Sequence, residues 1–287
     1  MPVGRGDTSM TPIGVFDSGL GGLTVVREMI ARMPSERFIY VGDSGHAPYG
    51  AHSEAAIRSF SEGISRFLLS HYHCRGLVIA CNTATAAAAD FLRATLPVPV
   101  VGMEPAVKPA AAVTKTGKVG ILATVGTLSS ARFAALLTRF EGDGSVEFLM
   151  QPCPGLPEAV EEGRTGTAET RALVEKYVLP LLDKGADTLV LGCTHYPVLR
   201  PLIASVAGPA VTLIDTGAAV ARRAAALFDV SESECRGASS ANLTLFTTGD
   251  VHAFHRGACA ILGEIAVVRP PEKLTWKNGE LTTNGTS

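Results

Sequence analysis

The sequence lacks the features that mark several classes of protein. Its six cysteines form no Cys-x-x-Cys pair and no compact repeating spacing, which argues against a zinc site, a dithiol redox site or a disulfide scaffold and favours reduced thiols. No run of about 18 apolar residues occurs, as a membrane-spanning helix would need. We therefore expect no bound metal and no membrane partner.

A surplus of one charge is also missing. Lys and Arg number 25 against 27 Asp and Glu, which gives a formal net charge of −2, and the basic residues are scattered along the chain. No nucleic-acid partner is therefore expected. Residues 1–12 are polar and glycine-containing and have no apolar segment of the kind that a secretory signal needs. A cytoplasmic location follows as the expectation.

The chain has 287 residues, 46% of them hydrophobic, which suits one large α/β domain or two smaller ones. Apolar strand-like runs alternate with longer helical patterns, and such alternation predicts parallel strands joined by right-handed crossovers. The expected strands are 13–17, 37–42, 76–81, 98–102, 118–123, 145–151, 188–191, 212–214 and 243–247. Helices are expected over 22–33, 53–73 and 83–94, and an alanine-rich helix after residue 105.

Two pairs of strand ends recur after roughly a hundred residues. Residues 77–83 and 189–195 each place a cysteine after an apolar run, and residues 13–19 and 119–125 form the upstream pair. The sequence therefore predicts an α/β fold with two pseudo-symmetric lobes, each a parallel sheet flanked by helices, and an active site in the cleft between them. The expected domains are a first lobe of 13–104 and 216–270, a second lobe of 105–215, and loosely ordered tails over 1–12 and 271–287.

Cys81 and Cys193 are the candidate reactive thiols. A thiol between a strand and a helix lies near orphan backbone N–H groups, which favour the thiolate and so a base or a nucleophile. Both cysteines follow an apolar run and precede polar residues, and this shared pattern favours a reactive role over a structural one. The other four cysteines, which we interpret as small buried hydrophobic residues, are Cys74, Cys153, Cys235 and Cys259.

Polar residues surround both thiols. Asn82, Thr83 and Thr194 would provide a carboxylate cradle, or simply cap helices. Asp17 closes an apolar strand, where a carboxylate needs a partner or a task, and helix capping or an ion pair is its alternative. Ser18 is a donor or a cap. His195, two residues beyond Cys193, would tune or share the proton of that thiol, unless its role is structural.

The glycine-rich run 19–24 resembles a nucleotide-binding turn only weakly. Thr24 occupies the third glycine position, and Asp17 would lie unfavourably close to a pyrophosphate. The run Pro48-Tyr49-Gly50 is interpreted as a bent loop with a phenolic donor, or as a surface turn. No lysine lies at a matched strand end, so no pyridoxal phosphate and no other cofactor is expected.

These motifs together resemble those of the glutamate racemases. The similar segments span about residues 13–268: 14–22, 48–50, 80–84 and 191–197. Gly192-Cys193-Thr194-His195 looks like the glutamate enzymes, whereas the related aspartate racemases have Glu in place of the histidine. The segment 153–163 is similar to a Cys-Pro stretch that ends in an acidic site residue, here Glu161, although Gly155, Pro157 and Glu158 depart from the usual pattern.

The resemblance implies a cofactor-independent enzyme that converts L-glutamate into D-glutamate for peptidoglycan. Cys81 and Cys193 would be the acid/base residues on opposite faces of the substrate, with Asp17 and His195 as polar partners and Glu161 as a further catalytic residue. The substrate ligands implied are Asp17, Ser18, Pro48, Tyr49, Gly50, Asn82, Thr83, Thr124, Thr127, Thr194 and His195. Helix capping is the alternative for Thr124 and Thr127.

Two other readings stay open. One is a racemase of aspartate or of a hydantoin on the same fold, and the other is a non-catalytic two-lobed protein that binds an amino acid. Only an enzyme needs two thiols, because inversion of an α-carbon requires a base on one face and an acid on the other. A homodimer is expected.

Overall fold

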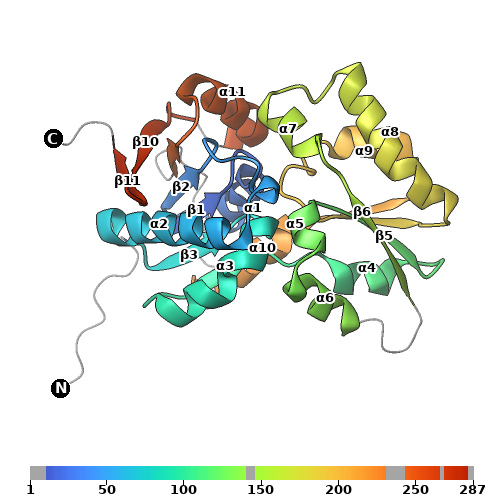
Figure 1. Cartoon of the computed structure of the whole chain (residues 1–287), viewed down its shortest axis with the longest axis horizontal. Helices are drawn as coiled ribbons and strands as arrows, with labels where there is room; N and C mark the ends of the chain where they lie inside the picture. The colour runs from blue at the N-terminus through green and yellow to red at the C-terminus, as the bar shows by residue number, and fades with distance from the viewer. Residues whose placement is uncertain (1–10, 140–145, 231–242, 266–267, 284–287) are drawn as a thin grey trace.

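The computed structural model describes residues 11–139, 146–230, 243–265 and 268–283. Its strands form two sheets that lie side by side in Figure 1, one in each lobe. The first sheet has the order β11-β10-β9-β2-β1-β3-β4, and the second has the order β6-β5-β7-β8. The chain passes from the first sheet to the second after β4 and returns after β8.

The strands follow the apolar runs of the sequence closely. In the first sheet they are β1 (Ile13–Asp17), β2 (Phe38–Gly42), β3 (Gly76–Ile79), β4 (Val100–Gly102), β9 (Leu243–Thr247), β10 (Glu272–Lys277) and β11 (Glu280–Thr283). In the second they are β5 (Lys118–Ala123), β6 (Glu147–Pro152), β7 (Thr188–Leu191) and β8 (Thr212–Ile214). All strand pairs except β10 with β11 are parallel.

The two lobes repeat one arrangement of strands. In each, the first strand of the lobe lies between its second and third strands, and the fourth lies outside the third: β2-β1-β3-β4 and β6-β5-β7-β8. This repeat confirms the predicted fold class of two related α/β lobes. It also makes β3 and β7 equivalent strands, so the cysteines that follow them occupy equivalent places.

Helices cover both faces of each sheet. In the first lobe, α1 (Leu23–Arg32), α10 (Gly217–Leu227) and α11 (Val251–Leu262) pack on one face, and α2 (Glu54–Tyr72) and α3 (Asn82–Thr95) pack on the other. In the second lobe, α7 (Leu156–Glu161), α8 (Ala168–Asp183) and α9 (Arg200–Ala207) pack on one face, opposite α4 (Val107–Val113) and α6 (Ala131–Thr138). The short helix α5 (Val125–Leu128) follows β5, and single 3-10 turns occur at Tyr49–Ala51 and Gly263–Ile265. Among the described residues, no helix combines the length and the apolar character needed to cross a membrane.

The prediction of a loosely ordered tail over 271–287 is wrong for residues 272–283. This segment forms the hairpin β10–β11, which adds two strands to the first sheet and makes that sheet mixed rather than parallel. Asn278 and Gly279 have φ values of 51° and 82°, as a two-residue hairpin turn requires. Leu274 and Leu281 are buried in the core beneath α2. Residues 284–287 lie outside the described residues.

The other predicted tail, 1–12, is described only at its last two residues. Thr11 accepts a hydrogen bond from the Arg75 side chain, and Pro12 accepts one from the Arg75 backbone N–H. Residues 1–10 lie outside the described residues, as does Cys235.

Candidate active site

The carboxyl ends of corresponding strands from the two lobes meet at one small cavity. Cys81 follows β3, Cys193 follows β7, and Thr124 follows β5. The cavity is lined by Ser18, Pro48, Tyr49, Gly50, Cys81, Asn82, Thr83, Thr124, Pro157, Cys193, Thr194 and His195. Of the predicted site residues, Asp17, Thr127 and Glu161 lie behind this lining and contact it. Both thiols therefore line one space between the lobes.

The cavity is small. Its volume is about 10 Å³, roughly the room for one water molecule. A neighbouring cavity of about 150 Å³ shares Pro48, Gly50, Thr124 and Pro157 with it and extends to the exposed Val125. An amino acid is larger than the inner cavity, so its access requires the lining segments to move, as lids and lobes do in many enzymes.

Cys81 is the N-cap of α3, as predicted. Its Sγ accepts a hydrogen bond from the Ala84 N–H at 3.4 Å and donates to Ser18 Oγ at 3.7 Å. Burial raises the pKa of the thiol well above its ordinary value, and the neighbouring Asp17 charge adds to the shift. The helix amide acts in the opposite direction but is outweighed. Burial and Asp17, rather than the helix amide that the sequence suggested, therefore dominate the pKa of Cys81.

Cys193 has different surroundings. It follows β7 as predicted, but turns occupy residues 194–199 before α9 begins, so no helix starts at this thiol. Pro197 disfavours a helix here, because it has no backbone N–H to donate and makes helical backbone less favourable at the residue before it. The nearest polar partner is His195, whose Nδ1 lies 3.5 Å from the Cys193 Sγ. An imidazole thus takes the place of the helix amide that serves Cys81.

Glu161 completes a chain of polar groups that begins at Cys193. His195 Nε2 lies 2.6 Å from Glu161 Oε1, and this oxygen also accepts the Leu20 N–H at 2.6 Å. The histidine is buried, with an exposed fraction of 3%. Burial disfavours its protonation, but the hydrogen bonds to Cys193 and Glu161 outweigh burial and raise the pKa of His195 well above its ordinary value. A protonated His195 would stabilise a thiolate at Cys193.

Asp17 lies between the two lobes at the end of β1. It is fully buried, and its Oδ2 accepts the Gly22 N–H at 2.6 Å and the Thr194 hydroxyl at 3.4 Å. Its Oδ1 accepts the Ser18 hydroxyl at 3.4 Å, and Ser18 in turn contacts Cys81. Burial raises the pKa of Asp17, and nearby His195 partly opposes this shift.

The glycine-rich loop after β1 binds the protein's own carboxylates. Its amides hold Asp17 and Glu161 at the start of α1, a position that favours anions. Glycine is required because the lobes come very close here. A Cβ at Gly19 would lie 2.0 Å from Glu161 Oε1, and one at Gly21 would lie 2.7 Å from His195 Nδ1. The run that weakly resembled a nucleotide-binding turn is thus an interface with the second lobe.

Hydroxyl and amide groups also line the cavity. Thr83 Oγ1 lies 2.9 Å from Thr124 Oγ1 and 3.4 Å from Thr127 Oγ1, which joins α3 to the second lobe. Thr124 also caps α5, so its predicted alternative role as a cap is real. Asn82 is buried, and neither its Oδ1 nor its Nδ2 has a hydrogen-bond partner among the described residues. Buried amides normally have partners, so Asn82 is available to bind a ligand.

Sequence reasoning missed Asp43 as part of the site; this residue lies behind the segment Pro48-Tyr49-Gly50 that lines the cavity. The Tyr49 hydroxyl, expected to face the ligand, donates instead to Asp43 Oδ2 at 2.8 Å. The Tyr49 hydroxyl is therefore engaged within the protein, although Tyr49 is among the lining residues of the cavity. A signal was present, because Asp43 directly follows the apolar strand β2, and Asp17 ends the neighbouring strand β1. Pro157 was also missed as part of the lining.

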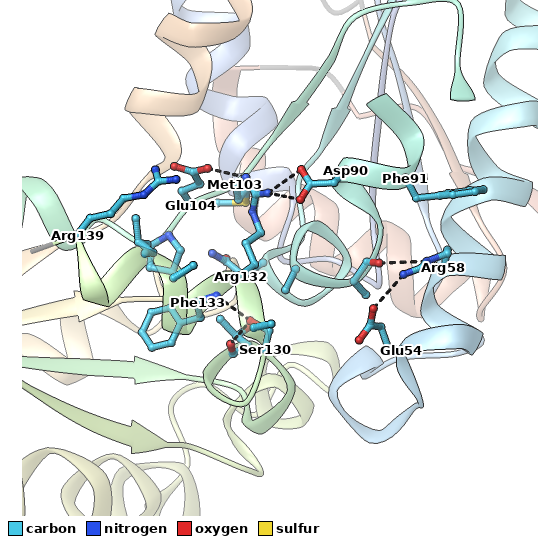
Figure 2. Close-up of a pocket in the computed structure, with 18 residues that line it drawn as sticks. Glu54, Arg58, Asp90, Phe91, Met103, Glu104, Ser130, Arg132, Phe133 and Arg139 are labelled. Carbon is cyan, nitrogen blue, oxygen red and sulfur yellow. Dashed lines mark hydrogen bonds and ion pairs between the residues drawn. The ribbon is translucent and has the colours of Figure 1, made fainter. Parts of the chain in front are cut away.

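A larger cavity, of about 420 Å³, lies elsewhere at the junction of the lobes. Figure 2 shows Arg132 of α6 reaching from the second lobe to Asp90 of α3 and to Glu104, with ion-pair distances of 2.8 and 2.6 Å. Asn82 and Thr127 line this cavity as well. No cysteine is among its described lining residues, so the two candidate thiols belong to the smaller cavity.

The Glu161–His195 pair gives a pH-dependent contribution to stability. Because the folded-state pKa of His195 is raised, this stabilisation is complete below its unfolded pKa of about 6.5 and disappears as pH rises through its folded pKa. We expect Glu161→Gln to lower the free energy of unfolding by about 1–3 kcal/mol at pH 6, and the difference from the wild type to shrink at alkaline pH. Urea denaturation of both proteins between pH 6 and pH 10 measures this difference in the free energy of unfolding.

The adjacent Glu162→Gln is the matched control, since Glu162 is 59% exposed and pairs with Arg164. It should leave the free energy of unfolding unchanged across this range. A difference between Glu161→Gln and the wild type that stays constant from pH 6 to pH 10 would contradict the raised pKa of His195.

Together the fold and the site define a class of protein: a two-lobed α/β protein with two potential acid/base thiols at one cavity. The model of the Asp/Glu/Hydantoin racemase family matches residues 13–224. The chain belongs to this family, and the resemblance and the class of enzyme inferred from the sequence, an isomerase, are confirmed.

Individual proteins show the same similarity. A glutamate racemase of Ectopseudomonas mendocina (strain ymp) is 51% identical over 262 residues, which are 91% of this chain and 98% of that protein. The crystal structure of a glutamate racemase isoform from Bacillus anthracis superposes with a TM-score of 0.79 at 35% identity, covering 91% of this chain and 97% of that one. The Escherichia coli glutamate racemase in complex with L-glutamate and the activator UDP-MurNAc-ala gives a TM-score of 0.76 at 31% identity, with 89% and 96% covered.

Proposed function

We propose that the chain is a glutamate racemase that inverts the α-carbon of glutamate with two cysteines and no cofactor. The observation that carries the proposal is that Cys81 and Cys193, at equivalent strand ends of the two lobes, line one cavity. Inversion needs a base on one face of the α-carbon and an acid on the other. Glutamate, rather than another amino acid, is supported by the relatives of this chain.

In the proposed reaction, one cysteine begins as a thiolate and removes the α-proton, and the other begins as a thiol and delivers a proton to the opposite face. Their protonation states are exchanged after one turnover. Cys193 would deprotonate L-glutamate, with protonated His195 stabilising its thiolate at 3.5 Å. Cys81 would deprotonate D-glutamate, with Asp17 and Ser18 as its polar partners.

The substrate carboxylates need hydrogen-bond donors, since these stabilise the negative charge that develops when the α-proton leaves. Asn82, Thr83, Thr124 and Thr194 supply side-chain donors at the cavity. The ammonium group of the substrate would also oppose the rise in the pKa of Cys81 that burial and Asp17 cause. Closure of the lobes then excludes water from the reacting groups.

Circular dichroism separates this function from its rivals. Purified protein without added cofactor should remove the signal of L-glutamate and of D-glutamate, and should act on L-aspartate and on a chiral hydantoin far more slowly. Faster loss of the aspartate or hydantoin signal would assign another racemase activity. Saturable glutamate binding without any loss of signal would assign the non-catalytic binder.

The wider role follows from the product. D-glutamate is a component of peptidoglycan, so we assign the reaction to cell-wall precursor supply in the cytoplasm. A homodimer is part of the same proposal, and sedimentation of the purified protein tests it.

A further inference from the structure

Asp43 and Trp276 form a partly buried hydrogen-bonded contact beside the site. Asp43 is fully buried at the end of β2, and its Oδ1 accepts the Trp276 indole N–H at 2.9 Å and the Thr248 hydroxyl at 2.6 Å. Its Oδ2 lies 2.8 Å from the Tyr49 hydroxyl and 3.0 Å from His46 Nδ1. A buried carboxylate is costly unless it is paired. Four side-chain groups here satisfy its two oxygens.

These partners come from three separate parts of the chain. His46 and Tyr49 belong to the loop 44–50, Thr248 follows β9, and Trp276 lies on β10 of the C-terminal hairpin. Thr248 also accepts the Gly45 N–H through its hydroxyl at 2.9 Å. Asp43 therefore ties the loop to two neighbouring strands of the first sheet.

The position of Trp276 is itself fixed by packing. Its ring centroid lies 5.7 Å from that of His46 and 5.8 Å from that of Phe60. Gly63 of α2 makes room for the indole, because a Cβ there would come within 2.6 Å of it. The hairpin thus presents the indole N–H to Asp43 from a defined place.

The loop held in this way forms a wall of the thiol cavity. Pro48, Tyr49 and Gly50 line the cavity, and a Cβ at Gly50 would lie 3.4 Å from the Cβ of Thr124 in the second lobe. One side of the loop therefore rests on Asp43, and the other meets the site and the opposite lobe. A shift of Asp43 would move the cavity wall.

We infer that Asp43 and Trp276 are positioning residues, through which the C-terminal hairpin holds the substrate-binding loop 44–50 in place. The inference rests on the proposed function for its effect on glutamate. Neither residue lines the cavity, so both act through Tyr49 and its neighbours. Contacts of this loop would hold the substrate before and during reaction alike, so their loss should appear mainly in KM.

The test compares Trp276→Phe with Leu281→Ala. The first variant keeps an aromatic ring but removes the N–H that Asp43 accepts. The second removes a core side chain of the same hairpin, 3% exposed, which lies opposite Trp276 in the strand pair but makes no hydrogen bond to Asp43. Thr248→Val removes the other donor to Oδ1 and serves as a second variant. The readouts are hydrogen–deuterium exchange of residues 44–52, KM and kcat for glutamate, and the melting temperature.

We expect Trp276→Phe and Thr248→Val to accelerate exchange in residues 44–52 and to raise KM about fivefold, the order of effect of one typical intramolecular hydrogen bond, with a smaller change in kcat. Leu281→Ala should lower the melting temperature without either effect. Unchanged exchange and KM in Trp276→Phe, or equal changes in Leu281→Ala, would overturn the inference. A wild type that does not racemise glutamate would refute the proposed function, and the exchange data would still decide whether Trp276 holds the loop.

Discussion

Replacing either Cys81 or Cys193 with Ala should lower the rate of glutamate racemisation by about 10²–10⁴-fold in both directions. Each turnover uses one residue as base and the other as acid, so neither direction can proceed with a single thiol. The structure supports this expectation because both side chains are almost fully buried, with exposed fractions of 4% and 7%, and line the same cavity. Circular dichroism started from each enantiomer measures both rates.

Cys74→Ala is the matched control. Cys74 is also a buried cysteine of the first lobe, but it packs in the hydrophobic core beneath α2 and lines none of the cavities of the site. This variant should be less stable and keep the wild-type rates. If Cys81→Ala or Cys193→Ala retains more than about a tenth of the wild-type rate, that residue is not one of the two bases, because a positioned proton-transfer group contributes far more.

The second large effect concerns the partners of the two thiols. His195→Asn should lower kcat from L-glutamate by about 10²-fold, because the imidazole beside Cys193 and its hydrogen bond to Glu161 are lost. Asp17→Asn should act mainly from D-glutamate, through Ser18 and Cys81. The overall equilibrium fixes the ratio of kcat/KM in the two directions, so the asymmetry is expected in kcat and KM separately and in isotope effects.

Primary deuterium isotope effects with each α-deuterated enantiomer measure this pairing. Proton abstraction should become more rate-limiting from L-glutamate in His195→Asn and from D-glutamate in Asp17→Asn. Asp17 also accepts a hydrogen bond from Thr194 of the second lobe. Asp17→Asn therefore removes contacts in both lobes, and an effect confined to the D-glutamate direction would be the stricter test of the pairing. Equal increases in both directions for both variants would show that neither residue serves one thiol, and the two-thiol mechanism would stand.

The sequence predicted the fold well wherever a short apolar run is bounded by polar or glycine residues. The strands β1, β5, β7, β8 and β9 have the predicted bounds, and the recurring strand ends located both cysteines. These features are local, because burial of a parallel strand on both faces demands a continuous apolar run. The C-terminal hairpin was missed because its strands are half-exposed and mix polar with apolar residues, although Asn278-Gly279 is a hairpin signal.

Other features depend on contacts between distant parts of the chain. The partner of Asp43 on the hairpin lies 233 positions away, and no local pattern links the two. Glu161 was the least regular match to its motif, yet it lies against His195 and the glycine-rich loop. The raised pKa of Cys81 also escaped the sequence, because it reflects burial and a neighbouring carboxylate rather than the helix that follows the thiol.

The path of the proton tests the central claim most directly. Wild-type protein is incubated with L-glutamate in deuterium oxide, without added cofactor, and the label at the α-carbon of both enantiomers is followed from the start of the reaction by mass spectrometry after chiral separation. With two bases, D-glutamate should carry solvent deuterium from its first appearance, while the remaining L-glutamate is initially unlabelled. Deuterium entering L-glutamate as fast as it enters D-glutamate would indicate a single base serving both faces, and would contradict the assignment of Cys81 and Cys193 as opposed acid and base.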